Sequence, residues 1–325
     1  MPANPGPAAA LDVDAVVVGG GPAGLAAATW LGRYRRSVLV VDSREYRSRM
    51  VERSHGYLGR DPQRPVDLIA RGREEALAYP TVTIRPGCVQ VVRRGDGRFD
   101  VTVDGEQVTA HRVVLACGVK DALPEVAGFD EHYGASVFHC PACDGYEARD
   151  RDVVAIGWDP QLVGFASTLL NWAKSVTVVT NGRRFQGEQA CRDKLAEQRI
   201  PLLECDVVEF VGQRGDLTGI RLDDGQLIPT SLVFFSIAHQ PRTELAERIG
   251  CRLDEEGYVV VDAQGETDVP GIYAAGDLVP GLQLVQVAAG SGAVAGVAAA
   301  QSFFGERGAC TSPDPAPDPA VPGEE

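Results

Sequence analysis

The order of apolar and polar positions predicts two similar α/β units along the chain. Residues Asp14–Val18 form a short apolar run, followed by a glycine-rich turn, a helix through about Arg33 and a second apolar run at 38–42. Short apolar runs bounded by turn residues are typical of parallel strands that are buried on both faces. The same order recurs over residues 152–179. We therefore expect an α/β fold with two Rossmann-like, three-layer dinucleotide-binding domains.

Alternating segments connect these units. Residues 89–92, 98–103 and 107–109 alternate between apolar and polar and are divided by Gly-Asp turns, which predicts a small antiparallel meander. A separate buried strand is expected at 113–118, and a second meander over 206–228. Both meanders follow a βαβ unit, as the internal repeat requires.

The pattern predicts that the chain returns to the first unit near Thr243, so the second domain is expected to be inserted in the first. We expect one dinucleotide-binding domain from residues 1–120 and 244–325, and a second domain from 121–243. The stretch 311–325 is rich in Pro, Asp and Glu, which predicts a disordered tail.

The last apolar segments predict two strands and a helix. Residues 257–262 and 271–277 have strand patterns, and the second of these ends in Gly-Asp. A helix of small residues is expected from about Gln283 to Phe304. Its glycines at 290, 292 and 296 would let a large flat group lie close to the backbone.

The first turn has the composition of a phosphate-binding turn. Gly19, Gly21 and Gly24 follow the G-x-G-x-x-G pattern, and Pro22 and Ala23 open the helix between them. Such glycines permit a tight turn and the approach of a pyrophosphate to backbone N–H groups at a helix N-terminus. Asp42 ends the next strand about 20 residues on, where a carboxylate can hold a ribose hydroxyl. We predict that a dinucleotide binds here.

The corresponding turn of the second unit departs from this pattern. Gly157 is present, but Asp159 and Leu162 stand where the second and third glycines are expected. Trp158 and Asp159 add bulk and negative charge at the place of a pyrophosphate. Arg183 and Arg184 follow the next strand and keep some positive charge nearby.

One motif predicts redox chemistry. Cys140 and Cys143 are separated by Pro141-Ala142, a spacing that places two sulfurs in bonding range on the first turn of a helix. Asp144 follows directly and can transfer a proton to or from a leaving thiolate. Half of a zinc site is the alternative, but zinc needs about four ligands and no second Cys-x-x-Cys or Cys/His pair occurs.

Charge and cysteine content narrow the possible partners. The formal net charge is −14, which disfavours nucleic acid and anionic membranes as partners. We see no secretory signal, and eight irregularly spaced cysteines do not look like a secreted disulfide framework, so a cytoplasmic location is expected.

His55, in the long polar segment 44–64, either lies over a bound cofactor or is solvated. Cys117 is expected to be a small core residue.

These motifs together resemble the low-molecular-weight thioredoxin reductase family of two-domain flavoproteins, over nearly all of residues 13–304. The resemblance implies FAD at the first turn, with further contacts from Gly118, Gly276, Asp277 and Gln283. It also implies that Cys143 lies against the flavin, that Cys140 exchanges with substrate and that Asp144 is the acid/base. A homodimer and a dithiol or disulfide substrate, either a small molecule or a thioredoxin-like protein, are further implications.

The altered second turn resembles the branch of this family that lost its NADPH site. That branch includes dithiol oxidases of the gliotoxin type and divergent thioredoxin reductase-like enzymes with other electron donors. The oxidases tend to have His where this chain has Asp144, so reductase chemistry stays open. We therefore expect an FAD-dependent thiol-disulfide oxidoreductase; the alternatives are an NADPH-dependent thioredoxin reductase and a non-catalytic flavin-containing redox sensor.

Overall fold

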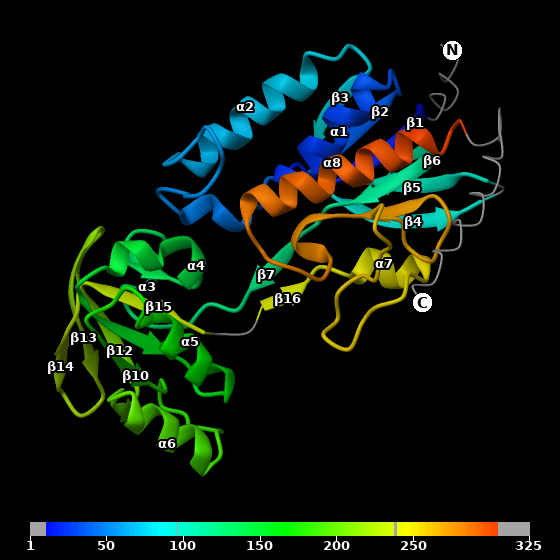
Figure 1. Cartoon of the computed structure of the whole chain (residues 1–325). Coiled ribbons are helices and arrows are strands. Elements are labelled where there is room, and N and C mark those ends of the chain that lie inside the picture. The colour runs from blue at the N-terminus through cyan, green and yellow to red at the C-terminus, as the bar shows by residue number, and fades with distance from the viewer. Residues whose placement is uncertain (1–10, 96, 237–238, 305–325) are drawn as a thin grey trace, which may run out of the picture.

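The first domain contains a seven-stranded sheet built on the glycine-rich unit (Figure 1). The computed structural model describes residues 11–95, 97–236 and 239–304. Neighbouring strands follow the order β3-β2-β1-β6-β5-β4, and β17 also pairs with β6. The strands are β1 (Leu11–Val18), β2 (Val38–Asp42), β3 (Val82–Pro86), β4 (Val89–Arg94), β5 (Phe99–Val103), β6 (Glu106–Leu115) and β17 (Ile272–Ala274).

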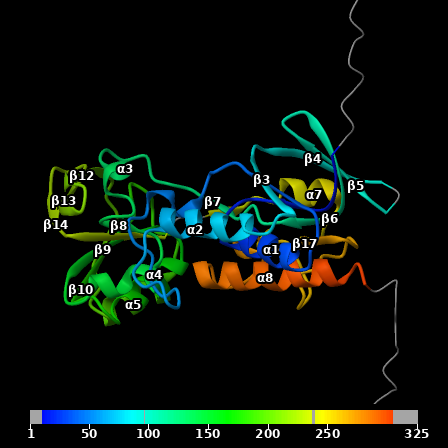
Figure 2. The same cartoon turned by 90° about the horizontal axis from the view of Figure 1, so that it is seen from above.

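Helices α1 and α8 pack closely together on this sheet (Figure 2). A Cβ at Gly292 would lie 2.0 Å from the Ala23 carbonyl oxygen, and one at Gly296 would lie 2.6 Å from that of Ala27. The expectation that these two glycines admit a flat ligand is therefore wrong, because the group pressed against them is helix α1. The helices are α1 (Pro22–Arg33), η1 (Arg47–Met50), α2 (Pro65–Leu77), α7 (Glu244–Ile249), η3 (Gly276–Leu278) and α8 (Val285–Gln301).

Strand β6 unites two segments that the sequence pattern separated. Its first half pairs antiparallel with β5, from Glu106 to Ala110, and its second half pairs parallel with β17, from Val113 to Leu115. Strand β1 runs along its other edge over the whole length from Val108 to Leu115. The prediction of two separate strands is wrong because one long strand belongs to both the meander and the parallel sheet.

Two further expectations differ from the structure. Strand β3 was not predicted, although it pairs parallel with β2 at the edge of the sheet. Residues 257–262 do not form a strand; an isolated bridge joins Val259 to Leu253, and the rest of this segment forms loops. The expected tail 311–325 lies outside the described residues.

The second domain repeats the parallel arrangement in a five-stranded sheet of order β11-β10-β9-β15-β8, beside a three-stranded antiparallel sheet of order β12-β13-β14. The first sheet comprises β8 (Val137–Phe138), β9 (Asp152–Ile156), β10 (Ser175–Val179), β11 (Leu202–Leu203) and β15 (Leu232–Phe235). The second comprises β12 (Val207–Gln213), β13 (Asp216–Leu222) and β14 (Leu227–Pro229). The helices are α3 (Phe129–His132), α4 (Pro141–Asp144), η2 (Gly145–Ala148), α5 (Gln161–Leu169) and α6 (Gln189–Glu197).

The two domains are joined by a pair of antiparallel strands (Figures 1 and 2). The chain leaves the first domain through β7 (Val119–Asp121) and returns through β16 (His239–Pro241), and the two strands pair with each other. We propose the domain boundaries at 120/121, within β7, and at 243/244, two residues after β16. In the described part of the chain, no helix is long and apolar enough to cross a membrane.

Candidate active site

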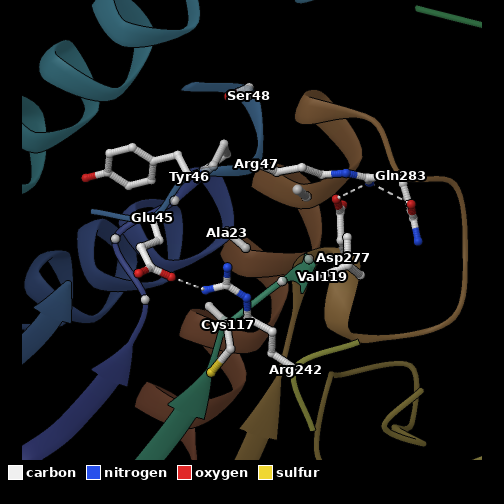
Figure 3. Close-up of a pocket in the computed structure, with 18 of the residues that line it drawn as sticks. Ala23, Glu45, Tyr46, Arg47, Ser48, Cys117, Val119, Arg242, Asp277 and Gln283 are labelled. Carbon is white, nitrogen blue, oxygen red and sulfur yellow. Dashed lines mark hydrogen bonds and ion pairs between the residues drawn. The ribbon is translucent and has the colours of Figure 1, made fainter. Parts of the chain in front are cut away.

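A cavity of about 490 Å³ extends from the glycine-rich turn to the cysteine motif and is lined by both domains. Figure 3 shows part of this lining, including Ala23, Asp277 and Gln283. Clefts of roughly 300–1,000 Å³ are typical of cofactor sites. Every predicted cofactor residue except Gly24 lines it, as do Cys140, Cys143 and Asp144. The fold therefore brings together residues that are more than 250 positions apart in the sequence.

At one end of the cavity, the N-terminus of α1 is open to an anion. Gly21 precedes the helix and provides no side-chain cap, and a Cβ built on it would meet nothing within 4 Å. Gly19 has φ 110°, and a Cβ there would lie 2.3 Å from the Ala116 carbonyl oxygen. Gly24 packs against the Gly19 carbonyl and does not line the cavity, which is the helix-packing role of a third glycine. This end fits a pyrophosphate.

Asp42 lines the same end but is 2% exposed. Its Oδ2 atom accepts hydrogen bonds of 2.5 Å from the Tyr46 hydroxyl and from Nη1 of Arg73, and Oδ1 accepts from the Arg44 N–H. Both oxygens thus have protein partners, and the bond to a ribose hydroxyl stays a prediction. Burial and the nearby carboxylate of Asp42 raise the pKa of Tyr46 to about 12.

Gly118 and Cys117 line the middle of the cavity. Gly118 has φ 67°, which favours glycine, and open space where a Cβ would stand. Burial raises the pKa of the Cys117 thiol to about 12, so this thiol stays protonated and unreactive at neutral pH. Its side chain packs against the first domain's core, as expected.

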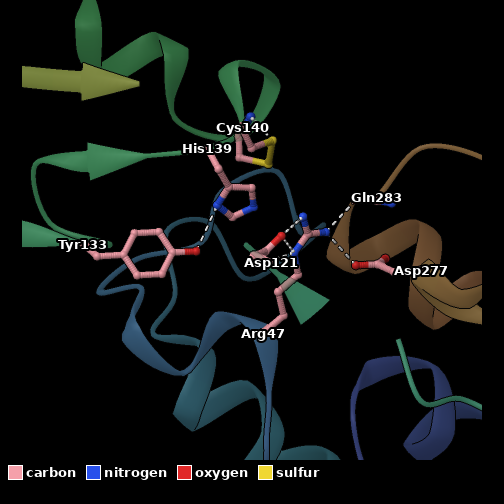
Figure 4. The surroundings of a disulfide bond; sticks show 8 residues. Arg47, Asp121, Tyr133, His139, Cys140, Asp277 and Gln283 are labelled. Atoms are coloured by element: carbon pink, nitrogen blue, oxygen red, sulfur yellow. Dashed lines mark hydrogen bonds and ion pairs between the residues drawn. A yellow bond between two sulfur atoms is a disulfide. The ribbon is translucent and has the colours of Figure 1, made fainter. Parts of the chain in front are cut away.

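Arg47 is a central site residue that the sequence did not single out (Figure 4). Its guanidinium donates to both carboxylate oxygens of Asp121, to Oδ2 of Asp277 at 3.0 Å and to Oε1 of Gln283 at 2.6 Å. Burial raises the pKa of Asp277, and Arg47 offsets only part of that shift. The sequence pattern did not distinguish Arg47, because this residue is one of many arginines in a polar segment.

Gln283 extends this network to the strand that returns from the second domain. Its Nε2 lies 3.0 Å from the Tyr258 hydroxyl and 2.9 Å from Nε2 of His239. His239 is the first residue of β16, and its Nε2 is 2.7 Å from the same hydroxyl. The cofactor end of α8 and the connecting strands are thus hydrogen-bonded together.

At the other end of the cavity, Cys140 and Cys143 form a disulfide with a Cα–Cα distance of 5.2 Å. Cys140 precedes the first turn of α4, and its sulfur accepts a 3.1 Å hydrogen bond from the Cys143 N–H. Pro141 starts the turn, where its missing N–H costs nothing. Because the sulfurs are bonded to each other, neither serves as a metal thiolate, which disfavours the zinc alternative. Within the ranges described above, no cluster of His, Cys, Asp and Glu could hold a metal.

The environment of the disulfide shifts the pKa values of two neighbouring side chains. Asp144 is 8% exposed, and burial, with a smaller contribution from Glu147, raises its pKa to about 7. Such a carboxyl can gain or lose a proton near neutral pH. His139, directly before Cys140, has its pKa lowered to about 4 by burial and by Arg47, so its imidazole is neutral. Its Nδ1 is 3.1 Å from the Tyr133 hydroxyl (Figure 4).

His55 lies beside the redox helix and is not merely solvated. Its Nδ1 is 3.0 Å from Asp61 and its Nε2 is 3.4 Å from Glu147, three residues after the helical turn that holds the disulfide. It also lines the cavity. The segment 44–64 therefore connects the first domain to the second at this point.

The second βα turn lies outside this cavity and is closed by its own side chains. The Asp159 carboxylate accepts a 3.1 Å hydrogen bond from the Leu162 N–H, in the first turn of α5. The Arg183 guanidinium stacks 4.2 Å from the centre of the Trp158 ring. Leu162 is fully buried and packs against Gly157. Trp158, Asp159, Leu162 and Arg183 thus each have a partner within the protein.

Comparison with known proteins agrees with this arrangement. Residues 13–292 match the family described as pyridine nucleotide-disulphide oxidoreductase. The thioredoxin reductase aclD of Aspergillus oryzae is 31% identical over 316 residues, which cover 90% of this chain and 98% of that protein. The thioredoxin reductase of Mycolicibacterium smegmatis is 30% identical over 87% of this chain and 94% of its own length.

A solved structure shows the same fold. The crystal structure of a putative thioredoxin reductase from Bacillus anthracis is 29% identical and superimposes with a TM-score of 0.84, covering 91% of this chain and 99% of that one. Proteins of this family bind FAD. The open α1 N-terminus, the glycine cradle and the polar groups of Asp277 and Gln283 fit that cofactor.

Proposed function

This chain belongs to the pyridine nucleotide-disulphide oxidoreductase family as a thioredoxin reductase-like, FAD-dependent disulfide oxidoreductase, and we propose that it works without productive NADPH binding. In this proposal, a dithiol substrate is oxidised at the Cys140–Cys143 disulfide. The electrons then leave by an acceptor other than a nicotinamide.

The hydrogen bond from the Leu162 N–H to Asp159 carries the proposal. A pyrophosphate binds at a βα turn because free N–H groups and the helix dipole attract it. Here a carboxylate already accepts from that N–H and adds a like charge. Two like charges at ~4 Å repel by about 1 kcal/mol in water and about 4 kcal/mol near a protein surface. Arg183, one of the two candidate clamps, is stacked on Trp158.

The chain's own residues account for the thiol chemistry. A substrate thiolate attacks the Cys140 sulfur, the S–S bond breaks and Cys143 leaves as a thiolate. The second substrate thiolate then displaces Cys140, so the substrate leaves as a disulfide and the protein keeps two electrons as a dithiol. Asp144 accepts a proton released in this exchange, because its pKa of about 7 lets it be unprotonated at neutral pH.

The α1 N-terminus, Asp277 and Gln283 would hold the cofactor, with the disulfide at the far end of the same cavity. When bound, FAD supplies the two-electron acceptor for this dithiol, with dioxygen as the final oxidant. Cys143 is proposed as the cysteine next to the flavin and Cys140 as the exchanging one, by their likeness to the family motif.

Asp144 supports a second candidate, a reductase with another electron donor. The dithiol oxidases that the motif resembles tend to have His after the second cysteine, and this chain has Asp. In that direction the same exchange runs in reverse, and protonated Asp144 donates to a leaving thiolate. The substrate is then a small disulfide or a thioredoxin-like protein.

One experiment separates these possibilities. The holoenzyme is mixed anaerobically with excess NADPH, and separately with a small dithiol, while flavin absorbance is followed. We expect bleaching with the dithiol and recovery on admitting oxygen, with little or no bleaching by NADPH. Rapid bleaching by NADPH would establish an NADPH-dependent thioredoxin reductase instead. A flavin that responds to neither, nor to a supplied artificial donor, would favour a redox sensor.

We also propose that the protein is a cytoplasmic homodimer. The irregular cysteine spacing supports the location, and the family resemblance supports the dimer. Light scattering on the purified holoenzyme tests the dimer.

A further inference from the structure

The second domain is connected to the first by only two chain crossings, β7 and β16. Domains joined in this way move relative to each other unless a further interface holds them. The disulfide belongs to the second domain, whereas the glycine-rich end of the cavity belongs to the first. The distance between redox pair and cofactor thus depends on what fixes the domain orientation.

A segment of the first domain crosses to the second and docks on it. We call residues 46–55 the strap. Met50, at the end of η1, packs against the second domain's core around Phe129 and Tyr133. The Glu52 N–H donates a 3.0 Å hydrogen bond to the Gly134 carbonyl. The contact is so close that a Cβ at Gly134 would lie 2.3 Å from the Met50 carbonyl oxygen.

Arg214, in the turn between β12 and β13, holds the strap from the other side. Its Nε donates to Oε1 of Glu52 at 2.8 Å, and its Nη2 donates to the Met50 carbonyl at 3.0 Å. Its Nη1 donates to the carbonyl of Glu131 at 2.8 Å, within its own domain. One guanidinium thereby joins the strap to the second domain with its geometry fixed on three sides.

The two ends of the strap are fixed at functionally important places. At its start, Arg47 binds Asp121, the last residue of β7, and Asp277 beside the cavity. At its end, His55 lies 3.4 Å from Glu147, directly behind the redox helix. The strap thus spans from the connecting strands to the disulfide.

We infer that the strap, clamped by Arg214, holds the second domain in the orientation that keeps Cys140 and Cys143 against the FAD cavity. Arg214 is a positioning residue, since it touches neither the cavity nor the disulfide. The inference rests on the proposed role of this cysteine pair as the redox centre.

The test measures how fast the reduced cysteine pair of the holoenzyme is labelled by a bulky maleimide, with mass spectrometry of the Cys140/Cys143 peptide. Arg214→Ala should raise this rate by about tenfold, since it removes two charge-assisted hydrogen bonds to the strap. The matched control is Arg221→Ala, which removes a guanidinium from the same sheet that pairs only with Glu209. That control should label at the wild-type rate.

Further variants separate orientation from stability. Arg214→Lys, which can still reach Glu52, should label at an intermediate rate. Gly134→Ala should raise the rate like Arg214→Ala, whereas Gly225→Ala should not: both positions have positive φ, but nothing lies within 4 Å of a Cβ at Gly225. If Gly134→Ala fails to fold, the comparison of Arg214→Ala with Arg221→Ala tests the inference.

Labelling of Arg214→Ala at the wild-type rate would contradict the inference that the strap holds the second domain in place. The inference also fails if the labelling rate of Arg214→Ala rises only in proportion to a lowered unfolding midpoint, because a general loss of stability would give that result. The assay needs neither substrate nor NADPH, so such a result would leave the proposed exchange reaction intact. Conversely, bleaching of the flavin by NADPH would reject the proposed function without affecting the labelling result.

Discussion

The Asp159 carboxylate caps α5 through the Leu162 N–H, while the equivalent end of α1 begins at Gly21 with no side-chain cap. The two βα turns share one architecture and differ in what meets the helix N-terminus. In one turn the anion is part of the protein, and in the other the position is open to the 490 Å³ cavity. Nucleotide affinity should therefore differ sharply between the two domains.

Removing this carboxylate should increase affinity for NADPH. Asp159→Ala removes a like charge and the side-chain acceptor of the Leu162 N–H, so we expect the dissociation constant to fall by about tenfold or more, ~1.4 kcal/mol. The control is Asp152→Asn at the opposite end of β9, where Asp152 is exposed and pairs with Lys174. Fluorescence titration with NADPH measures both. Equal, tight binding by wild type and Asp159→Ala would contradict the prediction.

The two cysteines should behave differently when changed singly. Cys140→Ser and Cys143→Ser should each abolish dithiol–disulfide exchange and retain FAD. Cys140→Ser alone should show thiolate-to-flavin charge-transfer absorbance, because its remaining thiolate is Cys143. Cys191→Ser, which alters a free thiol outside the cavity, serves as the control. Charge transfer in Cys143→Ser would reverse the proposed roles.

Titration of Asp144 should produce a step near neutral pH in the rate of dithiol oxidation. Its pKa of about 7 means that the carboxylate is protonated below and free to accept a proton above that pH. The rate of dithiol oxidation should therefore rise through pH 7. Asp144→Asn should remove this step and lower the rate by about 10²–10⁴-fold. The measurement is a pH–rate profile at saturating dithiol.

Glu147 provides the matched test of the same pKa. Its charge is the second cause of the raised pKa of Asp144. Glu147→Gln should therefore move the step in the pH–rate profile to lower pH without abolishing it. A step that stays in place in Asp144→Asn would show that another group titrates.

The purified protein should be yellow, and Gly21→Ala should weaken FAD binding without unfolding the chain. A Cβ at Gly21 meets nothing within 4 Å, so the fold tolerates it. The pyrophosphate would lose its close approach, and we expect binding about tenfold weaker. Gly19→Ala should impair folding as well, because of its positive φ and the contact with Ala116. FAD reconstitution with a thermal melt distinguishes them; full affinity in Gly21→Ala would contradict the placement of the cofactor.

Alanine should destabilise the protein at one glycine of α8 that packs against α1, but not at a nearby glycine of the same helix. Gly292→Ala places a methyl 2.0 Å from the Ala23 carbonyl oxygen and should destabilise the protein by about 1–3 kcal/mol. Gly290→Ala meets nothing within 4 Å and should be neutral or stabilising. Denaturant unfolding measures both, and equal stabilities would contradict this packing.

The sequence by itself determined the parts that depend on local chemistry. Apolar runs with glycine turns predicted the two βαβ units, and both occur as β1-α1-β2 and β9-α5-β10. The Cys140/Cys143 spacing predicted a disulfide-forming turn, and the structure has it. The substitution of Asp159 for glycine was visible directly. In each case the physical cause lies within a few residues, so a linear pattern contains it.

The tertiary structure decided what depends on residues distant in sequence. Local patterns divided β6 into two strands, because each half pairs with a different neighbour. Gly292 was assigned to a ligand, although its close neighbour is Ala23. The pattern could not single out Arg47 or Arg214, since an arginine's role is set by the carboxylates and carbonyls that the fold places around it. The hydrogen bonds of Arg214 to Glu52 and Met50 exist only once the two domains face each other.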